Sequence, residues 1–332
     1  MMKKKCFIHF GLHKTATSSF QECCYKNREY LRSLGLNFNS FFCEQKNQYN
    51  LINHSIPLYT LFSENPQFYH INLSWKVTDA LEDIKSSYQK QFDKLLKSEN
   101  ILISGEDLSL LKDSELKNFI NNIVNNDFEI YPFALYRKPY SYFCSQLQET
   151  IKKGEYAPFI RFKFQQPSPK YDLQTYLNYL TQSKRIKNLI SFFGDKIIFQ
   201  NFEDTLNEPN GPIGFILSNF LKLDASKFIY PSDNSNTSKS NLHIRLQNFL
   251  NKREPRFRGR NLNSNCFIIN KEFKCEKKFV LTEEEYELFK KPLEDEISFF
   301  KKHLGYSFKN DEIIFSEEFT LDDLIKTICS SL

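Results

Sequence analysis

A run of apolar residues near the start of the chain leads directly into small and hydroxyl-bearing residues. The segment Cys6–Leu12 is short and mostly apolar, and residues 13–19 read His-Lys-Thr-Ala-Thr-Ser-Ser. The first part has the composition of a buried strand. Ser18 and Ser19 each stand three residues before a Gln or a Glu, which is the spacing of a capping box at a helix start. The sequence therefore predicts a strand, a tight loop and a helix in succession, as in an α/β fold.

The predicted loop has the residues of an anion-binding site. The first N–H groups of a helix have no intrahelical partner, so they point toward whatever lies above the helix. Lys14 adds a mobile positive charge, and the hydroxyls of Thr15, Thr17, Ser18 and Ser19 add neutral donors that can also cap the helix. A phosphate group suits such a loop.

This loop differs from the common phosphate-binding loop of ATPases and GTPases. That loop reads Gly, four residues, and then Gly-Lys followed by Ser or Thr. Here His13 precedes Lys14, and Ile8 occupies the position of the earlier Gly. An ordinary ATPase or GTPase is therefore disfavoured. An unoccupied strand-to-helix turn with an exposed lysine is the alternative, so a second site is needed to support an anion-binding function.

A second predicted strand-to-helix turn carries a cation at its strand tip. Residues Glu129–Tyr136 read as a buried strand, Arg137 follows directly, and Pro139 stands where proline is favoured at a helix start. A guanidinium binds phosphate oxygens through charge-assisted hydrogen bonds, and the hydroxyl of Ser145 on the next helix suits a further contact. Ligands of open α/β sheets bind at the carboxyl ends of the strands. The alternative is that Arg137 pairs with an acid such as Glu106.

These segments resemble two motifs of the sulfotransferases that use 3′-phosphoadenosine 5′-phosphosulfate (PAPS). The first loop is similar to their 5′-phosphosulfate loop, which in bacterial members reads Gly-x-His-Lys-Thr-Gly-Thr-Thr/Ser-Ser-x-Gln. Ala16 stands where that family usually has Gly, so a positive φ there would strain its Cβ. Arg137 and Ser145 match the spacing with which the family holds the 3′-phosphate. The resemblance implies that PAPS is bound at its 5′ end by His13, Lys14, Thr15, Ala16, Thr17 and Ser18.

Two residues are candidates for the general base. The segment Ser-Gly-Glu-Asp-Leu at 104–108 is similar to the family's Ser-Ser-Glu-Asp-Leu, and Glu106 falls near the point where members carry a catalytic histidine or glutamate. His54, between Asn and Ser, resembles an Asn-His segment of bacterial relatives and is the rival base. The alternatives are that Glu106 or Asp107 caps the next helix or neutralises Arg137, and that His54 is a surface or hydrogen-bonded residue.

The resemblance implies a PAPS-dependent sulfotransferase on a P-loop-like three-layer α/β/α fold with a central parallel sheet. The sulfuryl group would move in line from PAPS to an acceptor hydroxyl, expected on a carbohydrate, and leave adenosine 3′,5′-bisphosphate. Lys14 would stabilise the leaving phosphate, and Glu106 or His54 would remove the proton; no metal is expected. The alternatives are a nucleotide-dependent kinase with an altered phosphate loop and a non-catalytic glycan- or anion-binding protein on the same fold.

Length and composition indicate the size of the core and the number of domains. The chain has 332 residues, of which 40% are hydrophobic and 34 are Phe, so a substantial core is available. We expect a single domain over 1–332, with a core over about 1–250 and a helical elaboration over about 262–332. Helical periodicity predicts helices over 79–96, 114–124 and 283–302, and an apolar run predicts a strand over 196–200.

Charge and cysteine content are compatible with this expectation, and the lack of a transmembrane segment is similar to soluble bacterial sulfotransferases rather than to the anchored Golgi members. A net charge of +5 is mild and does not imply nucleic acid. The basic segment 252–260 suits a loop over the nucleotide or a surface for an acidic acceptor; the alternatives are a solvated connection and a patch that contacts nucleic acid or membrane. The eight cysteines form no Cys-x-x-Cys pair. Since no secretory or transmembrane segment is seen in the sequence, we expect a cytoplasmic protein without stable membrane insertion.

Overall fold

The structure is a computed structural model that describes residues 3–165, 172–232, 239–258, 261–270, 278–308, 313–317, 320–322 and 325–326. The chain divides into two compact units, each made of two stretches of sequence. The first unit comprises Met1–Arg137 and Lys184–Ser232, and the second comprises Lys138–Ser183 and Asp233–Leu332. The expectation of one domain with a C-terminal helical elaboration stays a prediction.

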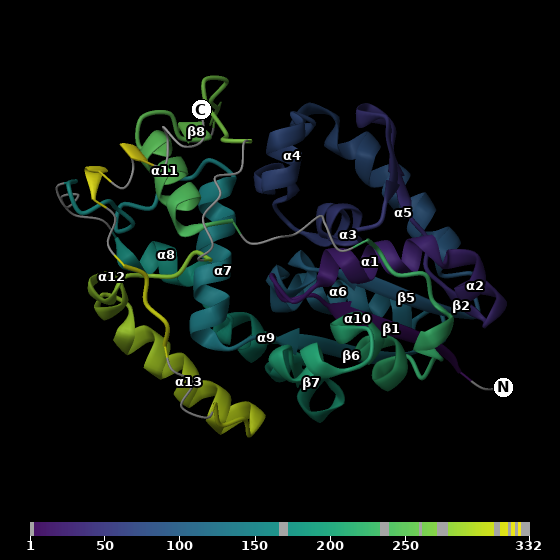
Figure 1. Ribbon diagram of the computed structural model, residues 1–332. Coiled ribbons are helices and arrows are strands. Elements are labelled where there is room, and N and C mark those ends of the chain that lie inside the picture. The colour runs from purple at the N-terminus through teal and green to yellow at the C-terminus, as the bar shows by residue number, and fades with distance from the viewer. Residues whose placement is uncertain are drawn as a thin grey trace. The chain divides into compact units, whose positions relative to one another are not determined.

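The first unit is built around a five-stranded parallel sheet (Figure 1). Its strand order is β2-β5-β1-β6-β7. The central strand is β1, in which Ile8 pairs with Ile103 of β5 and with Pro132 of β6. The predicted parallel sheet is therefore confirmed. In chain order its strands are β1 (Lys4–Phe10), β2 (Leu36–Asn37), β5 (Asn100–Gly105), β6 (Phe128–Tyr136) and β7 (Ile198–Asn201).

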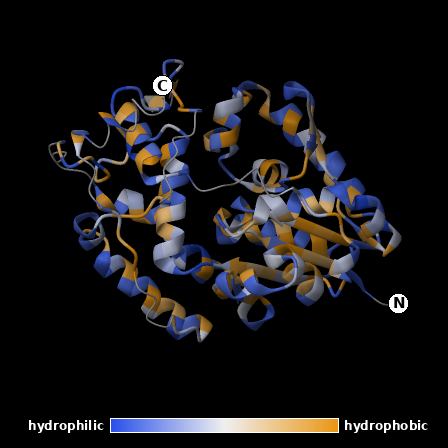
Figure 2. Cartoon of the chain, in the orientation of Figure 1, coloured by the Kyte–Doolittle hydropathy of each residue, from blue (hydrophilic) through white to orange (hydrophobic). Residues whose placement is uncertain are grey.

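Both faces of the central strands are buried, which explains their continuous apolar sequences. Leu102 and Ile103 are neighbours on β5 that point to opposite faces, and both are fully buried. Helices α1 (Thr17–Lys26) and α10 (Gly211–Phe215) share a core cluster with Leu102, and α6 (Asp113–Val124) contacts β6. The strands are the most uniformly apolar elements of this unit (Figure 2). This arrangement is compatible with a three-layer α/β/α fold.

The other elements of the first unit connect the strands. Predicted helices over 79–96 and 114–124 correspond to α5 and α6, and the strand predicted over 196–200 corresponds to β7. These elements confirm the periodicity in the sequence. The remaining elements are α2 (Arg28–Ser33), the hairpin β3 (Phe41–Cys43) and β4 (Gln48–Leu51), α3 (Ser55–Phe62), α4 (His70–Trp75), α5 (Leu81–Leu95) and α9 (Ser183–Phe193), whose first residue is the last of the second unit's first stretch.

The second unit is mainly helical in its described residues. Pro139 begins α7 as predicted, and the unit's core cluster includes Phe143 and Phe289. The single helix predicted over 283–302 is wrong, because the chain turns at Phe289 and buries this ring against Phe143, with centroids 4.7 Å apart. Of the predicted basic segment, 259 and 260 lie outside the described residues. The elements are α7 (Pro139–Lys152), α8 (Leu173–Leu180), α11 (Asn241–Asn251), β8 (Phe257–Arg258), β9 (Asn261–Leu262), α12 (Glu283–Glu287) and α13 (Lys290–Leu304).

Within the described ranges, every helix is too short or too polar to span a lipid bilayer.

Candidate anion-binding and transfer site

The loops that carry the predicted site follow β1, β5 and β6 at the carboxyl edge of the sheet. The chain leaves β1 toward the β5 and β2 side, whereas it leaves β6 toward β7 on the other side. The strand order therefore reverses between β1 and β6, which is where ligands bind in open α/β sheets. Lys14 follows β1 and Arg137 follows β6, so the two predicted cationic residues flank this point.

The loop after β1 has a backbone that suits an anion. Lys14 has φ 66° and Ala16 has φ 60°, so both residues are in the left-handed region. Helix α1 begins at Thr17, and no side chain caps it, so the N–H groups of its first turn open onto the loop. Backbone turns of this kind form concavities that bind anions. A Cβ on Gly11 would lie 2.5 Å from Cγ2 of Thr17, so only glycine allows this close approach of strand and helix.

The structure tests two predictions about this loop, of which one is confirmed and one is wrong. The positive φ at Ala16 confirms that the chain holds a strained alanine where the sulfotransferase motif has glycine. The capping box at Ser18 or Ser19 was wrong, because the helix starts earlier, at Thr17. The expected partner Gln21 instead donates to the carbonyl oxygen of Ser104 at 3.0 Å, so a tertiary contact takes the place of the local one.

The hydroxyl-bearing residues of the loop differ in burial and in hydrogen-bond partners. The hydroxyl of Thr15 is buried and donates to the carbonyl oxygen of Leu12, so it stabilises the loop itself. Thr17 is also buried, and its hydroxyl lies 3.5 Å from that of Thr15. Ser18 is exposed. Of these three predicted donors, only Ser18 is an exposed residue.

Arg137 joins the loop after β1 to the residues after β7. Its Nη1 donates to the carbonyl oxygen of Lys14 at 3.1 Å, and its Nε donates to Oε1 of Glu203 at 3.3 Å. The guanidinium also lies over the ring of Phe202, 5.2 Å from the centroid. Glu203 therefore pairs with Arg137, whereas the sequence suggested Glu106. The structure places the two predicted cation-bearing loops one hydrogen bond apart.

Glu106 lies directly beside the loop, joined to it by His13. Oε2 of Glu106 lies 2.8 Å from Nδ1 of His13, and Oδ1 of Asp107 lies 3.2 Å from Nε2 of the same ring. Both acceptors are carboxylates, so the ring must carry a proton on each nitrogen to satisfy both. Asp107 is held in turn by the hydroxyl of Tyr69 at 2.8 Å and, through its own N–H, by Ser55 Oγ at 2.8 Å.

The pKa values of this group agree with the geometry. Burial and the nearby charge of Arg185 lower the pKa of His13, but the hydrogen bonds to Asp107 and Glu106 outweigh them, so the pKa is raised. Burial raises the pKa of Asp107, and the hydrogen bond and charge of His13 outweigh burial, so this pKa is well below its usual range. The raised pKa favours the doubly protonated ring that the two carboxylate contacts require.

His54 has a different environment. It is fully buried, its Nε2–H donates to the carbonyl oxygen of Asn39 at 2.8 Å, and its Nδ1 accepts from the N–H of Ser104 at 3.2 Å. Burial lowers the pKa of His54 to about 4. Since both nitrogens bond to the backbone, the ring is neutral and fixes the loop before α3 to β5. This geometry favours Glu106 over His54 as a base.

Ser145 lies on α7, in the second unit, whereas Arg137 is the last residue of the first stretch of the first unit. Their joint contact with one phosphate stays a prediction.

Sequence reasoning missed Arg185 on α9. Its side chain is buried beside Ile186 and Leu189 on the apolar stripe of the helix, and its charge acts on His13 and Asp107. The available signal was a charged residue four positions before Leu189, within a stripe that is otherwise apolar.

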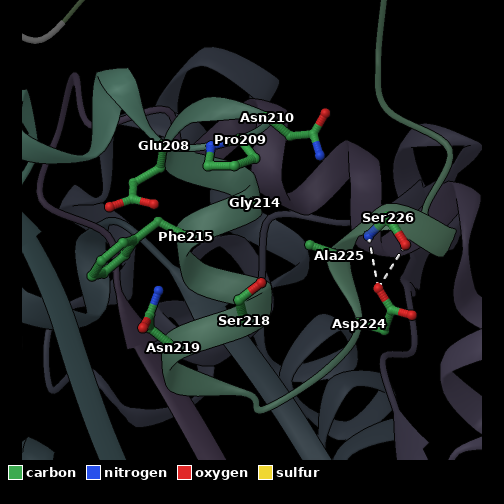
Figure 3. A pocket seen from close by; sticks show the side chains of 10 residues that line it. All are labelled: Glu208, Pro209, Asn210, Gly214, Phe215, Ser218, Asn219, Asp224, Ala225 and Ser226. Carbon is green, nitrogen blue, oxygen red and sulfur yellow. Dashed lines mark hydrogen bonds between the residues drawn. The ribbon is translucent and has the colours of Figure 1, made fainter.

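Two pockets lie among other residues of the first unit. One, of about 300 Å³, is bordered by 208–210, 214–215, 218–219 and 224–226, where Asp224 accepts from the N–H and the hydroxyl of Ser226 (Figure 3). The other, of about 330 Å³, is lined in part by Arg28, Arg32 and Lys94. Neither pocket is lined by a predicted site residue.

No protein-family model matches this chain, and a search of curated proteins finds no significant match.

Proposed function

We propose that this chain is a PAPS-dependent sulfotransferase on a P-loop-like fold, which transfers a sulfuryl group to a hydroxyl, most simply on a carbohydrate. The observation that carries the proposal is the hydrogen bond from Arg137 to the carbonyl oxygen of Lys14. It joins two cation-bearing loops at the point where the strand order reverses. A doubly phosphorylated adenosine needs two such cationic groups near each other.

The donor would be held from two sides. The N–H groups around Ala16 and the first turn of α1 suit the 5′-phosphosulfate, and Lys14 supplies charge for the oxygen that leaves with the 5′-phosphate. Arg137 suits the 3′-phosphate, with Ser145 as its predicted partner. Positioning and electrostatics would supply most of the rate, as in phosphoryl transfer.

Glu106 is the base that the geometry supports. Its Oε2 accepts from His13, and no described residue donates a hydrogen bond to its Oε1. In the proposed step the acceptor oxygen bonds to sulfur, the bond from sulfur to the bridging phosphate oxygen breaks, and the hydroxyl proton passes to Oε1. His13 would orient the carboxylate, since its other nitrogen is held by Asp107.

Calorimetry separates this proposal from a kinase with an altered loop. We expect the protein to bind adenosine 3′,5′-bisphosphate more tightly than ATP with Mg²⁺. Preference for ATP would contradict the proposal.

Turnover separates an enzyme from a glycan- or anion-binding protein on the same fold. We expect labelled PAPS to be consumed in the presence of a panel of carbohydrate acceptors. Lys14→Ala should reduce kcat by a larger factor than it reduces nucleotide affinity, because the charge on the leaving oxygen develops only in the transition state. Lys26→Ala, which removes a lysine from the far end of α1, is the matched control. Bound nucleotide with PAPS left intact by every acceptor would favour the non-catalytic alternative.

A further inference from the structure

The pocket of about 330 Å³ in the first unit is lined by three cationic side chains. Arg28 and Arg32 stand four residues apart on α2, so they lie on one face of this helix, and Lys94 comes from α5. The rest of the lining includes 38–41, which directly follow the edge strand β2. Cations from two different helices therefore line one cavity beyond the edge of the sheet.

The positive charge of this pocket is not neutralised by the protein. No Asp or Glu is among the described residues that line it. Oε2 of Glu29 lies 2.6 Å from Nη1 of Arg32, and Oε1 of Glu29 lies 3.7 Å from Nε of Arg28, so one carboxylate serves both arginines. Lys94 forms no ion pair with any residue that the structure describes. A net positive charge therefore remains at the pocket, and it attracts anions.

The walls of the pocket are fixed by hydrogen bonds and ring contacts of the protein itself. Gln91 joins α5 to β3, because its Oε1 accepts from the N–H of Phe42 at 2.8 Å and its Nε2 donates to the carbonyl oxygen of Phe42 at 2.9 Å. His54 donates to the carbonyl oxygen of Asn39 at 2.8 Å, and its ring stacks on Phe38 with centroids 4.7 Å apart. The pocket is thus formed before a ligand binds, as ligand sites commonly are.

The size and lining of the pocket suit more than a bare inorganic anion. Its volume falls at the lower end of the range of about 300–1,000 Å³ for small-molecule sites. Phe38, Phe41 and Leu95 are buried and give it an apolar floor. Asn39 and Ser40 add an amide and a hydroxyl, which can form hydrogen bonds with the hydroxyls of a ligand. Guanidinium groups bind phosphate and similar oxyanions through charge-assisted hydrogen bonds.

We infer that this pocket is a second binding site, for a small sugar that carries a phosphate or sulfate ester. The oxyanion of the ester binds to the cations of α2 and α5, and the sugar ring lies over the apolar floor. The inference does not depend on the proposed function, because none of the lining residues belongs to the loop after β1 or to the other predicted site residues. The competing explanation is that the three cations are solvated surface charges without a ligand.

The test is an NMR titration of the full chain with glucose 6-phosphate, glucose 6-sulfate, glucose and inorganic phosphate. The backbone amide signals of 38–42 report this pocket separately from those of 13–18 in the loop after β1. At 38–42, at least one of the two esters should bind about 10-fold or more tightly than glucose, as expected for a charge-assisted contact. The double variant Arg32→Gln with Lys94→Gln, at two exposed positions, should lose this preference. Lys90→Gln, at an exposed position of α5 outside the lining, should retain it.

Each alternative gives a different result. Equal binding of both esters and glucose at 38–42 would overturn the inference, as would a preference that survives in the double variant. Inorganic phosphate that binds as tightly as the esters would overturn the assigned ligand class, because the sugar would then contribute nothing. Signals that move only at 13–18 would place the anion in the loop after β1 and also overturn the inference. A higher affinity for one ester than for the other identifies the oxyanion that the pocket recognises.

Discussion

Replacing His13 by glutamine tests whether a protonated ring joins the carboxylates of the site. The ring makes two contacts, of 2.8 Å to Glu106 and 3.2 Å to Asp107. Charge-assisted hydrogen bonds contribute about 1.5–3 kcal/mol each when buried. The side chains of His13 and Glu106 are each 20% exposed, so solvent weakens the first contact. We therefore expect His13→Gln to lower the free energy of unfolding by about 2 kcal/mol at pH 5.5.

The pH dependence of this difference in unfolding free energy tests the protonated ring more directly than its size at one pH. The pKa of His13 is raised in the folded state, so its stabilisation is complete below the unfolded value of 6.5 and is lost as the pH rises through the folded value. The difference between the unchanged chain and His13→Gln should therefore shrink between pH 5.5 and pH 9 in urea unfolding. His303→Gln, at an exposed position on α13, is the control. A difference that stays constant or grows toward alkaline pH would refute the protonated bridge.

Three further variants test other parts of the structure. Ala16→Gly should raise the free energy of unfolding by up to about 1 kcal/mol, because φ is 60° at this position; a lower urea midpoint would argue against the strain. Glu296 accepts hydrogen bonds from the N–H groups of Gln182 and Ser183, and burial raises its pKa to about 7. The free energy of unfolding should therefore fall as the pH rises from 4.5 to 7, and Glu296→Gln should flatten this profile. An unchanged slope in Glu296→Gln would contradict this role of Glu296. Arg245→Met should lower the free energy of unfolding by about 3–5 kcal/mol in chemical unfolding, because it breaks the buried bidentate pair with Glu285. The double variant Arg245→Met with Glu285→Leu should recover most of this loss, because no buried charge is then left without a partner. An equally unstable double variant would show that the pair itself is essential.

The sheet and its functional edge could be predicted because their signals are local. Strand β5 and the carboxyl-terminal parts of β1 and β6 are buried, so each appears in the sequence as an apolar run. Pro139 marked the start of α7 because proline suits the first turn of a helix. The positions of Lys14 and Arg137 at the strand ends then followed from the parallel arrangement.

The contacts that define the site could not be predicted, because they join residues far apart in sequence. Glu106 and Asp107 follow a strand about ninety residues after His13, and Arg185 comes from a helix much later in the chain. The helix start was missed because Gln21, which suits a local capping box, is satisfied by Ser104 on a neighbouring strand. His54 could not be distinguished from Glu106 as a base until both of its nitrogens were seen to bond to the backbone.

The central claim is that the loop of Lys14 and the guanidinium of Arg137 bind opposite ends of one nucleotide. Calorimetric titration of adenosine 3′,5′-bisphosphate and of AMP into the unchanged chain and into Arg137→Ala tests it most directly. The unchanged chain should prefer the bisphosphate by about 10-fold or more, and Arg137→Ala should lose this preference while its affinity for AMP is retained. Lys26→Ala, at an exposed lysine, is the control. No preference in the unchanged chain, or an equal loss of affinity for both nucleotides in Arg137→Ala, would contradict the account.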